Sequence, residues 1–371
     1  MRVLHLGKSC PPKEGGIEIF SYDLLKYLNS QGVKADLLCF GERDGEDTYQ
    51  GFKYYGCKQS VKIWSAPLSY RFVKEFFKLC QNYDLIHVHS PNPLAEFLSL
   101  FSGKPLVVHW HSDIVRQRIT YKFYRPIQLA FLKKARKVIC TSPYYLESSA
   151  QLRGFREKAV VIPLGLDRKK IEPFQGQGQN ALKEKFKGKK IVLSVGRLVE
   201  YKGFEYLILA SKHIREDAVV LIAGAGPLYS KLAELVKTNQ LDDRVFLLGR
   251  VENVYEWMRE CDLFCLPSVS RNEAFGLVLL EALFFGKPLV TTAVEGSGMN
   301  FVNLDGVTGA VVAPKNPKAL ADAINNILGD KELYLKLSAN ARERFAEFDM
   351  ERVGCKVVDL YREVLSTSRS S

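Results

Sequence analysis

Two carboxylates, Glu273 and Glu281, stand eight positions apart in surroundings that could make them chemically useful. The apolar run 263–268 before them predicts a buried strand, and the run that ends at Gly286 predicts a helix closed by glycine. We therefore expect Glu273 in the loop outside the carboxyl end of a strand, and Glu281 about two turns into the following helix. There the two carboxylates could bind hydroxyl groups of a sugar and of a ribose.

The segment between these carboxylates contains Phe275 and Gly276, where the predicted helix begins. Because the first N–H groups of a helix lack intrahelical partners, its amino end suits a diphosphate or another polar ligand edge. A simpler interpretation is that one glutamate caps the helix and the other is buried beside a partner, since acidic caps are common. The spacing alone does not decide between the two interpretations.

A glycine-rich loop, Gly15-Gly16, follows the first predicted strand and opens onto a predicted helix. Glycine lets the backbone approach a ligand closely and tolerates positive φ. The loop lacks the Gly-x-Gly-x-x-Gly pattern of dinucleotide-binding proteins, and the chain has no P-loop motif. An ordinary tight turn is the alternative interpretation.

Two histidines, His109 and His111, lie at the end of another predicted strand. A histidine at the carboxyl end of a strand can hydrogen-bond a sugar hydroxyl or a developing charge. The two would point to one side if the strand continued, because side chains alternate along a strand. A metal site would need a third ligand, and none is evident nearby, so we predict no metal site.

Two cations, Arg197 and Lys202, occupy the turn that follows the first predicted strand of the second half, just after Gly196. A guanidinium and an ammonium at a helix amino end suit a departing diphosphate, whereas the alternative is a pair of solvated surface cations. Residues 44–47 look like a polar loop, and no Asp-x-Asp stands at a strand end to hold a metal ion. The two cations would then do what a divalent cation does elsewhere. Val251, just beyond a later strand, could contact a nucleotide base.

The elements that must position these residues alternate between short apolar runs and helical patterns. Continuous apolar runs indicate strands buried on both faces, and hence parallel sheets. Two successive series of this kind predict an α/β chain with two doubly wound domains. The expected strands are 3–6, 36–40, 85–89, 106–109, 138–141, 160–163, 191–195, 219–223, 245–248, 263–267, 289–292 and 309–312. The expected helices lie near 17–30, 68–81, 92–101, 121–135, 143–152, 203–214, 227–238, 254–260, 276–285, 317–328 and 331–347.

The polar segment 167–189 has the composition of a linker, which places one domain over 1–166 and the next over 167–349. Residues 350–371 follow without a new strand, and their amphipathic pattern suggests a helix that packs back on the first domain. Ligands of doubly wound sheets bind outside the carboxyl ends of the strands. We therefore expect the two domains to face each other across a cleft that holds the ligand.

The composition is that of a globular protein of two domains, since 371 residues are too many for one small core. No run of eighteen apolar residues exists that would span a membrane, and residues 1–7 indicate a buried strand rather than a signal peptide. The eight cysteines are scattered, and Cys261 and Cys265 lack a second pair or histidines nearby. We expect all eight to be reduced thiols of a cytosolic protein.

The net charge of +12 is concentrated in the first half of the chain. Residues 1–166 hold 24 Lys and Arg against 14 Asp and Glu, whereas the remainder is nearly balanced. The segment 116–137 holds eight of these cations, no acid, and interleaved aromatic and aliphatic residues. Such a segment suits an anionic membrane surface, and a solvated helix face is the alternative. No recognisable nucleic-acid-binding module is present.

Taken together, these motifs resemble the retaining glycosyltransferases of family 4, which have the GT-B fold, over essentially the whole chain. The resemblance is carried by Gly15–Glu18, His111–Asp113, Pro163–Asp167, Gly196–Gly203, Gly224–Pro227 and Glu273–Glu281. It departs at Leu164, where the family often has asparagine. The resemblance implies that 1–166 binds the acceptor, that 167–349 binds the nucleotide sugar, and that the final helix crosses back.

The resemblance also implies a role for each position. It places His111, Arg197, Lys202 and Glu273 in the catalytic set. Among these, His111 would contact a hydroxyl of the transferred sugar, and the two cations would neutralise the departing nucleoside diphosphate. The residues implied to bind the donor are Gly15, Gly16, Gly196, Arg197, Lys202, Val251, Phe275, Gly276 and Glu281, with Glu281 on the ribose hydroxyls.

The implied reaction moves a hexose from a nucleotide sugar to an acceptor hydroxyl with retention, and without a metal or other cofactor. The pattern looks most like bacterial mannosyl-type transferases of polysaccharide assembly, which favours GDP-mannose over a UDP-sugar as the donor. A lipid-linked or oligosaccharide acceptor, in the cytoplasm or peripherally at the inner face of the cytoplasmic membrane, would fit the basic first half. The rival readings are a UDP-sugar donor, an inactive sugar-nucleotide-binding scaffold, and an epimerase of the same fold.

Overall fold

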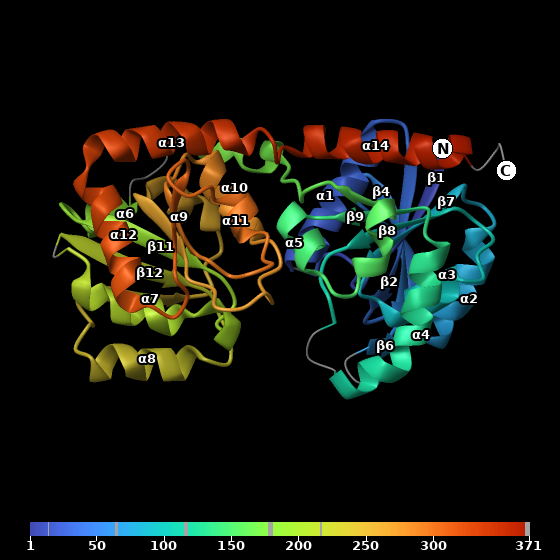
Figure 1. Cartoon of the computed structure of the whole chain (residues 1–371), viewed down its shortest axis with the longest axis horizontal. Coiled ribbons are helices and arrows are strands. Elements are labelled where there is room, and N and C mark those ends of the chain that lie inside the picture. Colours follow the sequence, from blue (N-terminus) through green and yellow to red (C-terminus); the bar gives the residue numbers. More distant parts are fainter. Residues whose placement is uncertain (14, 64–65, 115–117, 177–180, 216, 368–371) are drawn as a thin grey trace. The chain divides into compact units, whose positions relative to one another are not determined.

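A computed structural model describes residues 1–13, 15–63, 66–114, 118–176, 181–215 and 217–367 (Figure 1). The chain divides into two units, each with its own sheet. Unit 1 comprises Met1–Gly165 and Met350–Ser371, and unit 2 comprises Leu166–Asp349. The chain thus leaves unit 1 once, completes unit 2, and returns to unit 1.

Unit 1 is built on an eight-stranded sheet of order β10-β9-β8-β7-β1-β2-β4-β3. All neighbouring strands are parallel except β3, which runs antiparallel to β4. A separate ribbon pairs two short strands, β5 with β6. The strands are β1 (Arg2–Leu6), β2 (Lys34–Gly41), β3 (Gly45–Tyr49), β4 (Phe52–Lys58), β5 (Val61–Ile63), β6 (Ala66–Leu68), β7 (Leu85–Ser90), β8 (Leu106–Trp110), β9 (Lys137–Cys140) and β10 (Ala159–Val161).

The helices of unit 1 begin where side chains can satisfy their first N–H groups. Ser69, Asn92 and Ser142 each accept a hydrogen bond from the helix that follows, and proline occupies the first turn of the last two helices. The helices are α1 (Gly16–Ser30), α2 (Tyr70–Cys80), α3 (Pro93–Ser99), α4 (Arg118–Lys134), α5 (Pro143–Ser148) and α14 (Met350–Thr367), with a 3₁₀ turn η1 (Arg153–Lys158).

Helix α14 belongs to unit 1, although it follows unit 2 in the sequence (Figure 1, red). Its buried face includes Val353, Val357 and Tyr361, which recur at helical spacing. Gly354 lets α14 lie close against α1, because a Cβ at that position would come within 2.1 Å of the Tyr27 ring.

Unit 2 is built on a six-stranded sheet, entirely parallel, of order β13-β12-β11-β14-β15-β16. The strands are β11 (Lys190–Val195), β12 (Ala218–Ala223), β13 (Val245–Gly249), β14 (Leu263–Leu266), β15 (Leu289–Thr292) and β16 (Gly309–Val312). The α-helices are α6 (Ala181–Lys185), α7 (Phe204–Ala210), α8 (Tyr229–Thr238), α9 (Val254–Glu260), α10 (Leu277–Phe284), α11 (Met299–Val302), α12 (Pro317–Gly329) and α13 (Lys331–Phe345). The 3₁₀ turns are η2 (Arg168–Lys170), η3 (Glu172–Phe174), η4 (Glu200–Lys202) and η5 (Ser211–His213).

Both sheets reverse their strand order at one internal point. In unit 2 the reversal lies between β11 and β14, and in unit 1 it lies between β1 and β7. Loops that leave the carboxyl ends of two such strands diverge to opposite faces of the sheet, so a crevice opens there for ligands. The prediction of two doubly wound parallel sheets is therefore confirmed, and each sheet defines its own place to look for a site.

Two predictions made from the sequence were wrong. Only Asp44 of the predicted loop 44–47 lies outside a strand, because Gly45–Tyr49 forms β3, an exposed and charged edge strand that pairs with β4. Charges on an edge strand hide the β pattern while they protect the edge from further pairing. Nor are all cysteines reduced: Cys10, in the loop after β1, forms a disulfide with Cys39 on the neighbouring strand β2, with their Cα atoms 5.2 Å apart. Six other cysteines are free.

Candidate functional site

A buried ion pair marks the strand-order reversal of unit 2. Lys202, in the turn η4 after β11, places its Nζ 2.5 Å from Oε2 of Glu273, in the loop after β14. Both residues are 8% exposed. The Ser268 hydroxyl donates a second hydrogen bond to the same Glu273 oxygen, at 3.2 Å. The structure thus brings together two residues that the sequence assigned to the catalytic set.

The turn that carries Lys202 is fastened to the loop that carries Glu273. Val269 N–H donates to the Tyr201 carbonyl at 2.8 Å. Gly203 has φ of 65°, and a Cβ there would lie 2.3 Å from the Pro267 carbonyl oxygen, so only glycine fits. Gly196 makes room on the other side, because its Cβ would lie 3.3 Å from Lys202 Nζ. The position of the ammonium is therefore set by backbone on two sides.

Helix α10 begins beside this pair. Gly276, at its amino end, has φ of 82° and no side chain to cap the helix. A Cβ on Gly276 would come within 3.0 Å of Leu279, and Phe275 before it is buried. A tight, glycine-led entry of this kind brings the backbone of the first turn close to any ligand at the carboxyl edge of β14.

Glu281 lies on the second turn of α10 and is half-buried. Its carboxylate has no hydrogen bond or ion pair to any other residue that the structure describes. Burial raises the pKa of the Glu281 carboxyl to about 8. A carboxylate held without a partner in a partly buried place is costly unless a ligand supplies hydrogen-bond donors, which makes Glu281 a candidate for binding a hydroxyl pair.

The other predicted residues of unit 2 stand apart from the ion pair. Arg197 follows Gly196 directly, and its side chain is exposed, with no ion pair among the described residues. Val251 is half-buried beyond the end of β13, which is separated from β11 by β12. The structure therefore gathers Gly196, Lys202, Glu273 and Gly276 at one reversal point, and leaves Val251 two strands away.

In unit 1, the predicted glycines Gly15 and Gly16 form the entry to α1. Gly15 is extended, with φ of −175°, so its backbone does not itself demand glycine. A Cβ there would lie 2.3 Å from Oε2 of Glu18, the far end of a flexible side chain, so a side chain at this position would displace the Glu18 carboxylate. The Ser9 hydroxyl lies 3.4 Å from the other Glu18 oxygen. The absence of a side chain at Gly15 thus lets Glu18 fold back over the amino end of α1.

His111 belongs to a group of five buried histidines at the strand-order reversal of unit 1. The other four are His5 on β1, His87 and His89 on β7, and His109 on β8. The strand register pairs His5 with His87 and His89 with His109. Burial lowers the pKa of each of these imidazoles, that of His89 to about 3, so all five are neutral near pH 7.

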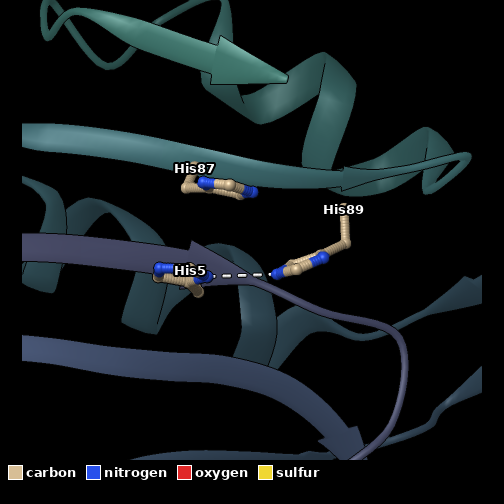
Figure 2. Close-up of side chains that lie close together, drawn as sticks. All are labelled: His5, His87 and His89. Atoms are coloured by element: carbon tan, nitrogen blue, oxygen red, sulfur yellow. Dashed lines mark hydrogen bonds between the residues drawn. The ribbon is translucent and has the colours of Figure 1, made fainter. Parts of the chain in front are cut away.

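These histidines form two layers of rings. His5, His89 and His111 meet edge to edge, and His87 and His109 lie over the two ends of that row. The ring centroids of His5 and His87 are 4.4 Å apart with their planes 9° apart, and those of His109 and His111 are 4.4 Å and 4° apart. Figure 2 shows the His87 ring above the His5 ring, and His89 with its edge toward His5.

Two sets of three imidazoles are close enough together to suggest a metal ion: His5, His87 and His89, and His89, His109 and His111. The third ligand that the sequence did not reveal is therefore present. However, a histidine binds a metal in the plane of its ring, and each set contains one stacked pair with nearly parallel planes. A single ion cannot lie in two parallel planes that far apart, so the ring geometry does not fit a metal site.

The sequence reading missed His5, His87, His89 and Tyr361, which extends from α14 to the first two. One signal was available: the pattern His-x-His occurs twice, at 87–89 and 109–111, near the ends of two predicted strands. Two such strands that are neighbours in a parallel sheet place four histidines on one face. Nothing in the sequence indicated that α14 would supply a tyrosine to them.

Comparison with known proteins fits this arrangement. Residues 14–170 match the family model for "Glycosyltransferase Family 4", and residues 179–344 match that for "Glycosyl transferases group 1". The chain is 33% identical to O-antigen chain mannosyltransferase C of Escherichia coli, over 99% of this chain and 100% of that protein. It is 32% identical to D-rhamnosyltransferase WbpZ of Pseudomonas aeruginosa, over 94% and 92% respectively.

Solved structures show the same fold. HepE from Anabaena, solved in complex with UDP, superposes with a TM-score of 0.81 at 21% identity, covering 98% of this chain and 100% of that one. Sucrose-phosphate synthase from Thermosynechococcus elongatus gives 0.80 at 23% identity, covering 99% of both chains. With its full-length relatives, its two family matches and its two parallel-sheet units, the chain belongs to the glycosyltransferases of family 4 and has the GT-B fold.

Proposed function

We propose that this glycosyltransferase moves a hexose, with GDP-mannose as the favoured donor, to a hydroxyl of a lipid-linked or saccharide acceptor, with retention, giving an α-glycosidic bond. The observation that carries the proposal is the buried Lys202–Glu273 pair beside the glycine-led start of α10. It offers a fixed positive charge for a leaving diphosphate and a fixed carboxylate for sugar hydroxyls.

The choice of sugar is supported by two full-length relatives, which are named for transfer of mannose and of D-rhamnose. D-Rhamnose is 6-deoxy-D-mannose, so the two sugars share their configuration at every ring carbon and differ only at C6. A donor of manno configuration is therefore the simplest expectation, and an O-antigen chain transferase as relative supports a role in polysaccharide assembly.

Each site residue then has a role. Lys202 and Arg197 would neutralise the departing diphosphate, for which Gly196 leaves space, and the backbone at Phe275 and Gly276 would meet the sugar and phosphate. Glu281 would bind the ribose hydroxyls, and Val251 would lie at the base. In unit 1, Gly15 and Gly16 would let the backbone approach donor and acceptor, and His111 would contact a hydroxyl of the transferred sugar.

Glu273 is better suited to hydrogen bonding than to covalent attack, because Lys202 and Ser268 both engage the same carboxylate oxygen. Both contacts reduce the nucleophilicity of that oxygen. We therefore favour attack by the acceptor on the face from which the diphosphate leaves, with a diphosphate oxygen taking the acceptor's proton. The protein supplies orientation and charge stabilisation. In this mechanism Lys202 and Arg197 take the part that a metal ion plays elsewhere, and EDTA should leave turnover unchanged.

The acceptor side is supported by the surface of α4. Lys122, Phe123 and Arg125 are exposed, and the Phe123 side chain is 76% exposed. An exposed aromatic between two cations suits an anionic lipid surface. The remainder of the basic segment is less available, since Lys134 donates to the Ser99 and Leu100 carbonyls.

Within that segment Lys137 also pairs with Glu363 at 2.8 Å. Arg116 lies outside the described residues. No described helix is both long and apolar enough to cross a bilayer. We propose a cytoplasmic protein that contacts the inner face of the membrane through Lys122, Phe123 and Arg125.

The first test is thermal unfolding with GDP, UDP, ADP and their common sugar conjugates. A ligand at a hundred times its dissociation constant adds about 2.7 kcal/mol to the free energy of unfolding, which gives a clear shift. Stabilisation by GDP and GDP-mannose, followed by release of GDP when acceptor is added, is the expected result. Stabilisation by UDP alone would replace the donor while keeping the site. No response to any nucleotide would favour the inactive scaffold, and an epimerised sugar nucleotide without transfer would show an epimerase.

A further inference from the structure

A row of hydrogen bonds connects α14 with His111 through the interior of unit 1. Tyr361 Oη lies 3.2 Å from His5 Nε2, His5 Nδ1 lies 3.1 Å from His89 Nε2, and His89 Nδ1 lies 3.0 Å from His111 Nε2. Every member is buried. Tyr361 also lies 2.6 Å from His87 Nδ1, at the far end of the row.

A neutral imidazole has one donor nitrogen and one acceptor nitrogen, so the proton position on one ring fixes that on the next. Burial keeps all five rings neutral, as described above. Only two arrangements therefore satisfy the whole row. In one, every imidazole of the row donates through Nε2 toward Tyr361. In the other, every imidazole carries its proton on Nδ1, so that His5 and His89 donate toward His111 and the His111 proton points out of the row.

The Tyr361 hydroxyl selects between the two arrangements, because it has only one proton. Hydrogen bonds donated by O–H are shorter than those donated by N–H, and Tyr361 lies 2.6 Å from His87 Nδ1 but 3.2 Å from His5 Nε2. Tyr361 therefore donates to His87 and accepts from His5. It follows that His5 accepts from His89, and that His89 accepts from His111.

The two arrangements also differ in which of two nitrogens without a partner carries a proton. His111 Nδ1 and His87 Nε2 have no hydrogen-bond partner within the described chain. In the selected arrangement His87 Nε2 carries the unmatched proton and His111 Nδ1 is a bare acceptor. The Ser21 hydroxyl donates to the Ile17 carbonyl at 2.7 Å, the shorter of its two contacts. It lies 3.2 Å from His89 Nδ1, whose single lone pair accepts from His111 in the selected arrangement, so Ser21 makes no hydrogen bond to His89 there.

We propose that Tyr361 is a positioning residue that, through His5 and His89, holds His111 in the tautomer with its proton on Nε2 and a bare Nδ1. His111 Nδ1 then accepts a hydrogen bond from a hydroxyl of the bound sugar and cannot donate one. This last step rests on the function proposed above for His111. The proton arrangement itself does not, since it is a property of the free protein.

The test is ¹⁵N NMR of the imidazoles in the full chain labelled with ¹⁵N-histidine, without ligand, because protonated and bare ring nitrogens resonate in separate ranges. His111 signals are assigned by their loss in His111→Gln. We expect a protonated Nε2 and a bare Nδ1 for His111 in the unsubstituted protein. A protonated Nδ1 on His111, or a mixture of tautomers, would overturn the proposal whatever the variants do.

Tyr361→Phe removes only the hydroxyl and should release the row, moving the His5, His89 and His111 nitrogen signals toward averages of two tautomers. Tyr27→Phe is the matched control: its hydroxyl also makes a contact to or from α14, lying 3.0 Å from Cys355 Sγ, but it makes no hydrogen bond with a histidine among the described residues. His111 signals that stay unchanged in a folded Tyr361→Phe protein would overturn the positioning role.

Kinetics separate this proposal from the proposed function. Loss of a residue that orients a catalytic group through another costs about tenfold or more, so Tyr361→Phe should lower kcat for donor turnover about tenfold with donor KM within about twofold. A merely structural role would instead move Tm and KM together. If the spectra change as expected but kcat does not, the tautomer has no part in the reaction, and the role proposed for His111 is wrong.

Discussion

Lys202 Nζ and Glu273 Oε2 lie 2.5 Å apart, so each of two proposed ligand-binding groups is held by the other. Such a pair keeps both side chains in place and reduces the reorganisation required when a donor binds. A diphosphate that arrives beside Lys202 must share the ammonium with Glu273. The carboxylate is then free to turn part of its hydrogen-bonding capacity to the sugar.

Removal of the ammonium should therefore affect both activity and stability. We expect Lys202→Ala to lower kcat on the order of a hundredfold, as loss of one charge stabiliser does, and to destabilise the fold because Glu273 is left buried and unpaired. The double variant Lys202→Ala/Glu273→Gln should recover stability but not turnover. Lys183→Ala, which removes an ion pair with Asp262 elsewhere in unit 2, is the control. If Lys202→Ala turned over within a few-fold of the unsubstituted enzyme, the role proposed for Lys202 at the diphosphate would be wrong.

A smaller substitution beside Lys202 tests whether the exact position of its ammonium group matters for turnover. Gly196→Ala would place a methyl group 3.2 Å from Lys202 Cε and 3.3 Å from Nζ, so the lysine must move by a few tenths of an ångström. We expect a loss of about tenfold in kcat/KM with little change in Tm, because displacements on this scale misplace a charge aimed at the transition state. Gly154→Ala has open space around its Cβ and should match the unsubstituted enzyme.

The partly buried carboxyl of Glu281 predicts that the stability of the protein depends on pH. Its folded-state pKa of about 8 lies above the ordinary value of 4.5, so the folded protein holds the extra proton between these values. The contribution of Glu281 to the free energy of unfolding is complete below pH 4.5 and is lost as the pH rises through 8. Glu281→Gln should therefore be more stable than the unsubstituted protein at pH 9, by on the order of 2 kcal/mol after allowance for partial exposure, and equal to it at pH 4.5.

The same pair of proteins tests the ribose role. If the carboxylate accepts from ribose hydroxyls, nucleoside diphosphate should bind more tightly as pH rises through 8, and Glu281→Gln should lose both the affinity and its pH dependence. Isothermal titration at pH 7 and pH 9 measures this. Equal affinity of the two proteins for the ribonucleotide at pH 9 would exclude Glu281 from the ribose.

The buried histidines predict acid lability. Their folded-state pKa values lie below the ordinary value of 6.5, so the unfolded chain binds protons that the folded chain refuses. Their contribution to stability is complete above pH 6.5 and is lost as pH falls below it, by about 1.4 kcal/mol per histidine for each pH unit. Urea unfolding between pH 7.5 and 5.5 should show this slope.

One substitution should reduce the slope of the free energy of unfolding against pH by the contribution of a single histidine. His109 makes no hydrogen bond through either ring nitrogen within the described residues, so His109→Phe keeps a flat ring on the stack and removes only the titration. His213→Ala provides the comparison, because it replaces a histidine that is exposed, in unit 2, and outside the buried group. A pH-independent free energy of unfolding over this interval would contradict the assignment of neutral buried rings.

The membrane contact is tested by vesicle binding. Lys122→Glu and Phe123→Ala should each reduce binding to anionic vesicles, with the first effect vanishing at high salt because screening already removes the charge contribution. Unit 2 supplies a matched exposed pair on α13, and Leu335→Ala and Lys336→Glu should have no effect. Equal binding by all four variants would show α4 to be an ordinary solvated surface.

The strands and helices that carry the sites could be predicted because the pattern of apolar residues along the chain indicates which segments are buried. Runs such as Val219–Ala223 are apolar without alternation, and the structure buries every one of these residues between two layers. The edge strand β3 could not be predicted, because an exposed strand needs no apolar residues. The Cys10–Cys39 bond could not either, since it depends on a loop after β1 lying against β2.

The candidate site divides in the same way. Lys202 and Glu273 follow the strands that flank a reversal of strand order, so local pattern and topology together bring them close. The row behind His111 required Tyr361, whose place beside β1 and β7 follows from tertiary packing of α14 alone. An amphipathic pattern shows that a helix packs, but it does not show which polar group will meet which partner.

The return of α14 to unit 1 has a consequence for synthesis on the ribosome. The five buried histidines are translated before unit 2, whereas Tyr361 is translated after all of it. Unit 2 has every one of its elements in a single uninterrupted segment and can complete its fold first. Unit 1, although it emerges first, must wait for its last helix with His5 Nε2 and His87 Nδ1 unmatched, so the usual order in which domains mature along a nascent chain is reversed.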